Sequence, residues 1–440
     1  MQNLPVLPSS LNQLETNIIK LMIVLFVVFS LLPYGLSWDY TGSSAVTMEG
    51  SLSTKLQWGS LFFLATIILY RHLPETLKDI RAMNPFLALV LIWCLASSLW
   101  SPLSATTFKR AIQLYGLVMI GFSIQLAARP LQLIVNYVLY TLTGMLILSF
   151  FMAVAVPGIG IDYELGGAWR GALSQKNELG QVAALSILLW QIKSCTETVG
   201  IRNLALGLLF SFFMLVMSKS STSMIITLLT TGMFHLLRKR HISSFYSLTR
   251  ASLVVLCLLT MAVYVFFMQE SRMPSWQEAA SPIASLFGKG TDLTGRTDIW
   301  QLVWLEINKH YLIGLGYGAF WLGPDSLSQF VIDALHWIPL QSHNGYLDIL
   351  NEQGLIGLVL VILTLVTQLW LLVMLSRLDR QQAAFWSAML AVVVITNFTE
   401  SSLFRGFVFQ NVFFIFSLIA VSCSTRRLKQ ARQLSSLGKV

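Results

Sequence analysis

Charged side chains are scarce in this chain. Asp, Glu, Lys and Arg make up only 11% of its 440 residues, whereas 55% are hydrophobic. A typical soluble domain is about 25% charged, so the composition excludes a soluble protein and predicts an all-α, polytopic membrane protein. The net charge of +9 would suggest nucleic acid in a soluble chain, but basic residues collect in the cytoplasmic loops of membrane proteins. We therefore expect the lipid bilayer, and no nucleic acid, as a partner.

Cysteines and cofactor-binding motifs are also rare. The four cysteines, Cys94, Cys195, Cys257 and Cys423, lie in or beside apolar segments without the spacing of metal ligands. The sequence contains no Walker loop, dinucleotide-binding fingerprint, His-Glu-x-x-His motif or acidic metal pair. We predict no disulfide framework, no metal and no cofactor. Without a cofactor or a bound nucleotide to supply energy, a reaction at the outward face would need a substrate that is already activated.

Long apolar runs fill most of the chain. A helix needs about 20 apolar residues to cross the hydrocarbon core, and this rule predicts about twelve transmembrane helices. They are expected near 18–37, 57–71, 84–100, 111–127, 131–156, 177–192, 203–217, 222–237, 251–268, 353–375, 382–397 and 405–424. The first run lacks the basic start of a cleavable signal and is longer than a signal core, so it is expected to be a span.

Basic residues predict the orientation. They concentrate in one set of short loops and in the C-terminal tail, and such loops belong in the cytoplasm. Both termini are therefore expected to be cytoplasmic. Four parts follow from this topology: an N-terminal bundle of about nine spans (1–268), a large loop that faces outward into a periplasm or the cell exterior (269–343), C-terminal transmembrane helices (344–424) and a basic cytoplasmic tail (425–440).

The large loop is too apolar for a disordered linker. An apolar face predicts a helix from about Asp298 to Asn308. Trp321 and Trp337 are expected to rest at the membrane interface, as aromatic belt residues do. We interpret the loop as a helical cap over the outer face.

Four polar motifs interrupt the apolar background, and the expected topology puts all of them at the outward face. They are Trp169-Arg170-Gly171 with Lys176-Asn177, Ser218 to Thr222, Leu293 to Trp300, and Ser342-His343-Asn344-Gly345. Ionisable residues at a membrane are costly to bury and are functional candidates by default. A group of cations with one histidine predicts an anionic substrate, such as a phosphate or pyrophosphate.

His343 and Arg296 are the leading candidates. His343 and Asn344 precede an apolar helix whose free N–H groups would attract an anion, and a neutral histidine there suits a general base. Alternatively, His343 could cap the helix or form a hydrogen bond with a loop. Arg296 could hold a phosphate bidentately or form an ion pair with Asp292 or Asp298.

The other cations and polar groups also have two interpretations each. Arg170 and Lys176, beside Asn177, could bind an anion or snorkel at a helix end. Lys219 and Ser221 lie in a serine-rich turn that suits either a phosphate cradle or helix capping.

Two further charges complete the candidate site. Glu400, a rare acid at an outward helix end, could orient His343 or pair with an arginine. Arg110 supplies outward positive charge, or anchors its helix.

Taken in order, the motifs resemble the O-antigen ligase and bacterial polysaccharide polymerase superfamily, and especially its branch of exopolysaccharide polymerases. The similar stretches are 97–101 (SSLWS), 169–180 (WRGALSQKNELG), 218–223 (SKSSTS), 293–300 (LTGRTDIW), 314–321 (GLGYGAFW), 342–358 (SHNGYLDILNEQGLIGL) and 399–402 (TESS). No single stretch is specific to this superfamily, but the order of the stretches and their shared topology are specific to it.

The resemblance implies a helical glycosyltransferase of the C type (GT-C) in a bacterial inner membrane, with a periplasmic active site and no metal. Its donor would be a glycan on undecaprenyl diphosphate. An acceptor hydroxyl would attack the anomeric carbon with inversion, and undecaprenyl diphosphate would leave. By analogy, His343 would be the base or would position the acceptor, and Arg296 would stabilise the diphosphate. Many relatives have arginine in the serine-rich turn, where this chain has Lys219.

The acceptor distinguishes the enzymatic alternatives. A polymerase would extend a growing glycan, with or without a chain-length regulator, whereas a ligase would transfer the polymer to lipid A-core. A transporter or flippase of lipid-linked sugars also fits twelve spans, although the two halves show no internal repeat.

Overall fold

The computed structural model describes residues 11–33, 51–163, 165–238 and 296–436. The expected span near 251–268 and residues 269–295 of the expected loop lie outside the described residues. Within the described residues the chain is mostly helical.

The helices are α1 (Gln13–Leu31), α3 (Leu52–Arg71), α4 (Leu73–Ala82), α5 (Pro85–Ala96), the 3-10 turn η2 (Ser97–Leu99), α6 (Ser104–Gln125), α7 (Pro130–Ala155), α8 (Pro157–Gly160), α9 (Lys176–Thr196), α10 (Ile201–Met217), α11 (Ser221–Arg238), α14 (Arg296–Ile307), α15 (Gln329–Leu335), α16 (Gly345–Ser376), α17 (Arg380–Thr396) and α18 (Phe409–Ser436). Two short strands, β1 (Ile161–Asp162) and β2 (Ala168–Trp169), pair antiparallel with Ile161 opposite Trp169.

Every expected span within the described residues overlaps a helix. Five of the described helices, α1, α3, α7, α16 and α18, are long and apolar enough to cross a membrane, and there are up to six if α4 and α5, which meet at 97°, form one broken span. A multi-pass helical membrane protein is therefore confirmed. The count of twelve spans and the GT-C class stay predictions.

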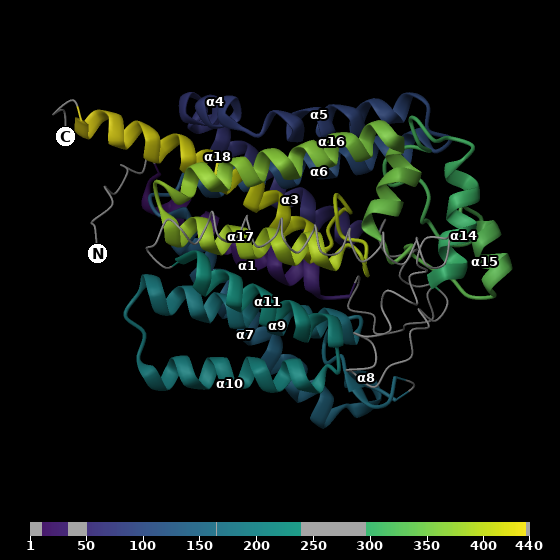
Figure 1. Ribbon diagram of the computed structural model, residues 1–440, viewed down its shortest axis with the longest axis horizontal. Helices are drawn as coiled ribbons and strands as arrows, with labels where there is room; N and C mark the ends of the chain where they lie inside the picture. Colours follow the sequence, from purple (N-terminus) through teal and green to yellow (C-terminus); the bar gives the residue numbers. More distant parts are fainter. Residues whose placement is uncertain (1–10, 34–50, 164, 239–295, 437–440) are drawn as a thin grey trace, which may run out of the picture.

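The long helices lie side by side, and the two ends of the bundle differ (Figure 1). Helices α8, α14 and α15 gather at one end, and the C-terminal part of α18 extends from the other. Helix α18 packs against α1, α6, α16 and α17, and Phe416 on α18 meets the Phe26 ring edge-to-face at 4.7 Å. This burial holds the segment before α18, residues 397–408, against the bundle.

Helix α16 is broken at Gly354, where φ is 67° and ψ is −172°. Only glycine adopts this backbone conformation readily, so a short segment, 345–353, precedes the long span. The sequence predicted these two pieces separately. The cap chain pairs with the break: Leu355 N donates to Tyr311 O at 2.8 Å, and Gly316 N donates to Glu352 O at 2.8 Å. The break therefore fastens the cap to a transmembrane helix.

The cap confirms one expectation and corrects another. Helix α14 runs from Arg296 to Ile307, close to the expected helix. Trp321, however, does not lie at an exposed interface. It is buried, and its Nε1 donates to Asp348 Oδ1 at 2.8 Å. A buried tryptophan usually finds such an acceptor for its N–H group.

Candidate functional site

The carboxylate of Glu400 joins side chains from distant segments of the chain. Its Oε2 accepts hydrogen bonds from His343 Nδ1 and Gln341 Nε2, each at 3.0 Å. Its Oε1 accepts one from Asn177 Nδ2 at 3.0 Å and lies 3.5 Å from Arg296 Nη2. Glu400 is only 8% exposed. The sequence predicted four members of this cluster, and the structure brings those four together with Gln341.

The surroundings of Glu400 keep it ionised. Burial by itself raises the pKa of a carboxyl group, but the hydrogen bond from His343, the charge of that ring when it is protonated, the charge of Arg296 and the hydrogen bond from Asn177 outweigh burial here and lower the pKa of Glu400 below its usual range. The site therefore holds a fixed negative charge between a histidine and an arginine.

The same contact orients the His343 ring. A carboxylate only accepts hydrogen bonds, so Nδ1 carries the hydrogen that it donates to Glu400 at 3.0 Å. In the neutral ring Nε2 is then a free acceptor, and no described residue occupies it. The Gln341 amide lies 3.3 Å from Nδ1 but donates to Glu400. Such a histidine, held by an acid, can take a proton from a hydroxyl group.

The expected anion site at the start of α16 is wrong. Asn344 Oδ1 accepts the N–H groups of Tyr346 and Leu347 at 3.1 and 3.2 Å. Gly345 N donates to Asn397 O, and Asp348 N donates to Asn344 O. All four N–H groups of the first turn are thus used within the protein. Asn344 is the helix cap, and any anion must be held by side chains.

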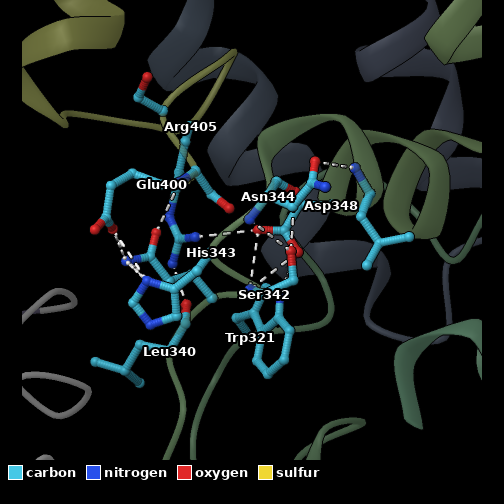
Figure 2. A network of polar contacts seen from close by, with 12 residues as sticks. Trp321, Leu340, Ser342, His343, Asn344, Asp348, Glu400 and Arg405 are labelled. Atoms are coloured by element: carbon cyan, nitrogen blue, oxygen red, sulfur yellow. Dashed lines mark hydrogen bonds and ion pairs between the residues drawn. The ribbon is translucent and has the colours of Figure 1, made fainter. Parts of the chain in front are cut away.

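A second network holds the loop that carries His343 (Figure 2). His343 has a left-handed backbone with φ of 55°, a conformation that is uncommon outside glycine. Trp300 Nε1 donates to Ser342 O at 2.8 Å, and Ser342 N donates to Asp348 Oδ1 at 3.3 Å. Arg405 Nη1 lies 3.4 Å from Asp348 Oδ2. Helix α14 and the segment before α18 therefore both restrain this strained loop.

A cavity of about 200 Å³ adjoins these networks. It lies between α5, α16, the cap chain around Tyr317 and the segment before α18, with apolar walls that include Val90, Ile349 and Val361. Its ionisable and amide or hydroxyl lining residues are Cys94, Arg110, Tyr317, Asp348, Glu352, Gln353, Ser401 and Arg405. His343 and Arg296 lie outside its lining, so the cavity and the Glu400 cluster are neighbouring, distinct parts of the site.

Three more of the predicted cations donate to backbone carbonyl groups. Arg110 lines the cavity and donates from Nη1 to Gly318 O at 2.5 Å. Arg170 Nε donates to Ile159 O at 2.7 Å, and Lys219 Nζ donates to Gly166 O at 2.7 Å. Lys219 is exposed and has a left-handed backbone with φ of 50°.

Two predicted residues begin helices. Lys176 is the first residue of α9, next to Asn177, and Ser221 is the first residue of α11. In the serine-rich turn before α11, Ser218 Oγ donates to Leu215 O at 2.6 Å, and Ser220 Oγ donates to Ser223 Oγ at 3.0 Å. These hydroxyl groups serve helix capping, which was one of the two interpretations of the turn.

Sequence reasoning missed Gln341, Asp348 and Arg405. The rule that singled out Glu400 would also have found Arg405, because it is a charge in the same short segment between two apolar runs. Asp348 and Glu352 stand four residues apart in an apolar helix and so face the same side. Gln341 has no comparable signal.

Comparison with known proteins agrees with the motifs. Residues 206–362 match the sequence model of the O-antigen ligase family. The chain is also 29% identical over 205 residues to the "Exopolysaccharide production protein ExoQ" of Rhizobium meliloti (strain 1021), a match covering 45% of each chain. The chain thus spans less than half the length of this curated relative. Together the matches confirm the resemblance to the O-antigen ligase and polysaccharide polymerase superfamily.

The matched segment, residues 206–362, covers only part of the candidate site. Lys219, Ser221, Arg296, His343 and Asn344 lie inside residues 206–362. The other members, Arg110, Arg170, Lys176, Asn177 and Glu400, lie outside it. Glu400 connects the two sets, because its carboxylate accepts hydrogen bonds from Asn177 outside the segment and from His343 inside it.

Proposed function

We propose that this protein is an inverting glycosyltransferase that polymerises undecaprenyl-diphosphate-linked repeat units into exopolysaccharide or O-antigen. The observation that carries the proposal is the Glu400 carboxylate, which contacts His343 on one oxygen and Asn177 and Arg296 on the other. The buried Glu400 carboxylate thereby holds a candidate base, His343, at one oxygen and a cation for a phosphate leaving group, Arg296, at the other.

The reaction is a single displacement. His343 Nε2 accepts the proton of the acceptor hydroxyl, whose oxygen forms a new bond to the anomeric carbon of the donor sugar. The bond from that carbon to the diphosphate oxygen breaks, and its electron pair leaves with undecaprenyl diphosphate. Glu400 holds the ring through Nδ1 and stabilises the imidazolium that forms. Attack from the face opposite the leaving group inverts the anomeric centre.

Arg296 stabilises the charge that develops on the diphosphate. Its contact with Glu400 is long, at 3.5 Å, and its side chain is partly exposed, so its guanidinium N–H groups can turn toward a phosphate. Lys219, Arg170 and Lys176 supply further positive charge, and the hydroxyl of Ser221 and the amide of Asn177 supply hydrogen-bond donors. Lysine acts here as a point charge rather than a bidentate fork.

The proposal includes a topology. The cap and the candidate site face the periplasm, both termini face the cytoplasm, and about twelve helices cross a bacterial inner membrane. The separation of α14 and α15 from the C-terminal part of α18 in Figure 1 supports it, as does the basic composition of the C-terminal tail. The four-part division into 1–268, 269–343, 344–424 and 425–440 belongs to this proposal.

An O-antigen ligase is the second candidate, favoured by the description of the matching family. It would use the same base and the same donor, with lipid A-core in place of the growing glycan. The name of the R. meliloti relative, an exopolysaccharide production protein, supports the polymerase. A chain-length regulator as a further partner belongs to the polymerase alternative.

Reconstitution separates the candidates. Wild-type protein in proteoliposomes is supplied with a lipid-diphosphate-linked repeat unit, with and without lipid A-core, and the products are resolved by gel and mass spectrometry. A ladder that stays on the diphosphate lipid is the expected result. Transfer only in the presence of lipid A-core would identify a ligase. Folded protein that forms no glycosidic product in either case would contradict both enzymes and favour transport.

A further inference from the structure

The cavity beside the Glu400 cluster contains buried polar atoms that the protein itself does not satisfy. Among the described residues, both amide atoms of Gln353 and the hydroxyl of Ser401 lack a hydrogen-bond partner, although each residue is only 5% exposed. Both residues line the cavity. Buried polar groups nearly always have partners, and in the lining of a cavity these atoms are available to a ligand with its own donors and acceptors.

The remaining lining indicates which chemistry such a ligand has. Trp93, Tyr317 and Trp321 contribute aromatic surface, and Asp348 and Glu352 contribute carboxylate acceptors. An amide and a hydroxyl group both donate and accept hydrogen bonds. Apolar and aromatic walls with a few placed polar groups are typical of small-molecule sites. A sugar ring, with its C–H faces and its hydroxyl groups, presents the complementary surface.

The charges in the cavity argue against a diphosphate. Arg405 contacts Asp348 and also donates to the carbonyl of Leu340. Arg110 donates to Gly318 O, while Gly318 N donates to Glu352 Oε2 at 2.8 Å. Each cation is thus engaged by the protein, and the carboxyl groups of Asp348 and Glu352 lie in the same lining as the two arginines. An uncharged, hydroxyl-bearing ligand fits this lining better than a lipid-linked anion does.

The cavity and the proposed base share their supporting residues. Ser401 follows Glu400, which holds His343, and Ser401 N donates to Gln341 Oε1 at 3.0 Å. Leu340, which lines the cavity, precedes Gln341 in the loop that leads to His343. A sugar in the cavity would therefore lie against the same short segments that place the histidine.

We propose that this cavity binds the terminal sugar of the acceptor glycan and directs its hydroxyl group toward His343. Gln353 and Ser401 are the residues that recognise its hydroxyl groups. The inference rests on the proposed function, since it assigns the acceptor of that reaction to the cavity and leaves the lipid diphosphate with Arg296 and Lys219. It also explains why two buried polar side chains are kept beside apolar helices.

The test uses Gln353→Met and Ser401→Ala in the full-length protein in proteoliposomes. Gln368→Met is the matched control, because Gln368 is a fully buried glutamine on the same helix, also has an unpartnered amide oxygen, and lies outside the cavity lining. The acceptor is a fluorescently labelled, water-soluble repeat oligosaccharide from the producing bacterium. Acceptor and lipid-linked donor are varied separately, and thermal unfolding is measured for each variant.

The expected result is an acceptor KM about tenfold higher for Gln353→Met and for Ser401→Ala, the effect of one lost hydrogen bond. The donor KM stays within twofold, and Gln368→Met leaves both KM values unchanged. An unchanged acceptor KM with a higher melting temperature for Gln353→Met would overturn the inference, because the amide would then be only an unsatisfied core group. A rise in donor KM instead would also overturn it, by assigning the cavity to the donor.

A binding measurement separates this inference from the proposed function. Equilibrium dialysis of the labelled oligosaccharide against wild type and Gln353→Met needs no turnover. If wild type forms no product but binds the oligosaccharide, and Gln353→Met does not, the cavity is a sugar site and the glycosyltransferase proposal fails. If neither protein binds the oligosaccharide, the cavity inference fails whatever the activity.

Discussion

Glu400 contacts both His343 and Arg296, so its replacement should affect the reaction through these two side chains. In Glu400→Gln the side chain keeps its size but loses the charge that holds His343 and attracts Arg296. We expect kcat to fall about 10- to 100-fold, the range found when a supporting partner of a site histidine is removed. Glycosyl transfer in proteoliposomes measures this. A variant with wild-type kcat would show that Glu400 is not a positioning residue.

The lowered pKa of Glu400 predicts a pH dependence of stability. A carboxyl group whose pKa is lower in the folded state stabilises the fold above its unfolded pKa, about 4.3 for glutamate, and loses this contribution as the pH falls through the folded-state value. The melting temperature of wild type should exceed that of Glu400→Gln by a constant margin near neutral pH. The margin should shrink only below the ordinary carboxyl range. A margin that closes near pH 7 would contradict the ionised carboxylate.

The sequence identified His343, Arg296, Asn177 and Glu400 because polar and charged groups are rare in apolar helices, and each stood at a helix end. It did not show that one carboxylate would gather them. It also placed an anion at the start of α16, where Asn344 in fact takes the N–H groups. Whether the N–H groups at the start of a helix are free depends on which side chain accepts their hydrogen bonds, and the order of residues does not show this.

The break in α16 couples the cap to a membrane-spanning helix, and Gly354 is the residue that permits it. A Cβ atom there would lie 2.3 Å from Leu312 O, and its φ is 67°. Gly354→Ala should therefore destabilise the protein by at least about 1–3 kcal/mol, the cost of such a backbone for a non-glycine residue. It should also reduce transfer, because the 345–353 segment carries Asp348.

Gly144→Ala is the control for this substitution. Gly144 lies within α7 and has no atom within 4 Å of an added Cβ, so alanine there should be neutral or stabilising by up to about 1 kcal/mol. Thermal unfolding of the two variants measures the difference. Equal melting temperatures would show that the break does not require glycine.

Helix positions could be read from apolar runs, and most of the expected spans have helical counterparts. The contacts between distant segments could not be predicted from apolar runs. The stretch 97–101 meets the stretch 314–321, where Tyr317 N donates to Ser97 Oγ at 3.0 Å, and Trp321 turns inward to Asp348. These contacts depend on how the cap folds back onto α5 and α16, and a pattern of hydrophobicity within one segment does not contain that information.

Across the whole bundle, the end opposite the cap is held by a buried ion cluster (Figure 1). Asp79 on α4 is 1% exposed and lies 2.5 Å from both Arg426 and Arg427 on α18. Breaking a buried pair leaves uncompensated charge and costs about 3–5 kcal/mol. We expect Asp79→Ala to lose about that much stability in denaturant unfolding. Glu75→Gln is the control, because its pair with Lys78 is exposed and contributes at most about 0.5 kcal/mol.

The proposed topology makes the two ends chemically distinguishable. Ala334 on α15 and Gln433 near the end of α18 are both exposed. In cells with a permeabilised outer membrane, Ala334→Cys should react with a membrane-impermeant maleimide, whereas Gln433→Cys should react only after lysis. The parent protein provides the background of its own cysteines. Labelling of both variants from outside would contradict the arrangement.

Turnover by His343 variants tests the proposed chemistry most directly. His343→Asn retains a residue that tolerates the left-handed backbone, and His336→Ala replaces an exposed cap histidine whose φ, 59°, is also left-handed. With a lipid-diphosphate-linked repeat unit at saturation, His343→Asn should lower kcat by about 10²- to 10⁴-fold, and His336→Ala should stay within about twofold. Wild-type turnover by folded His343→Asn would contradict a histidine base at this site.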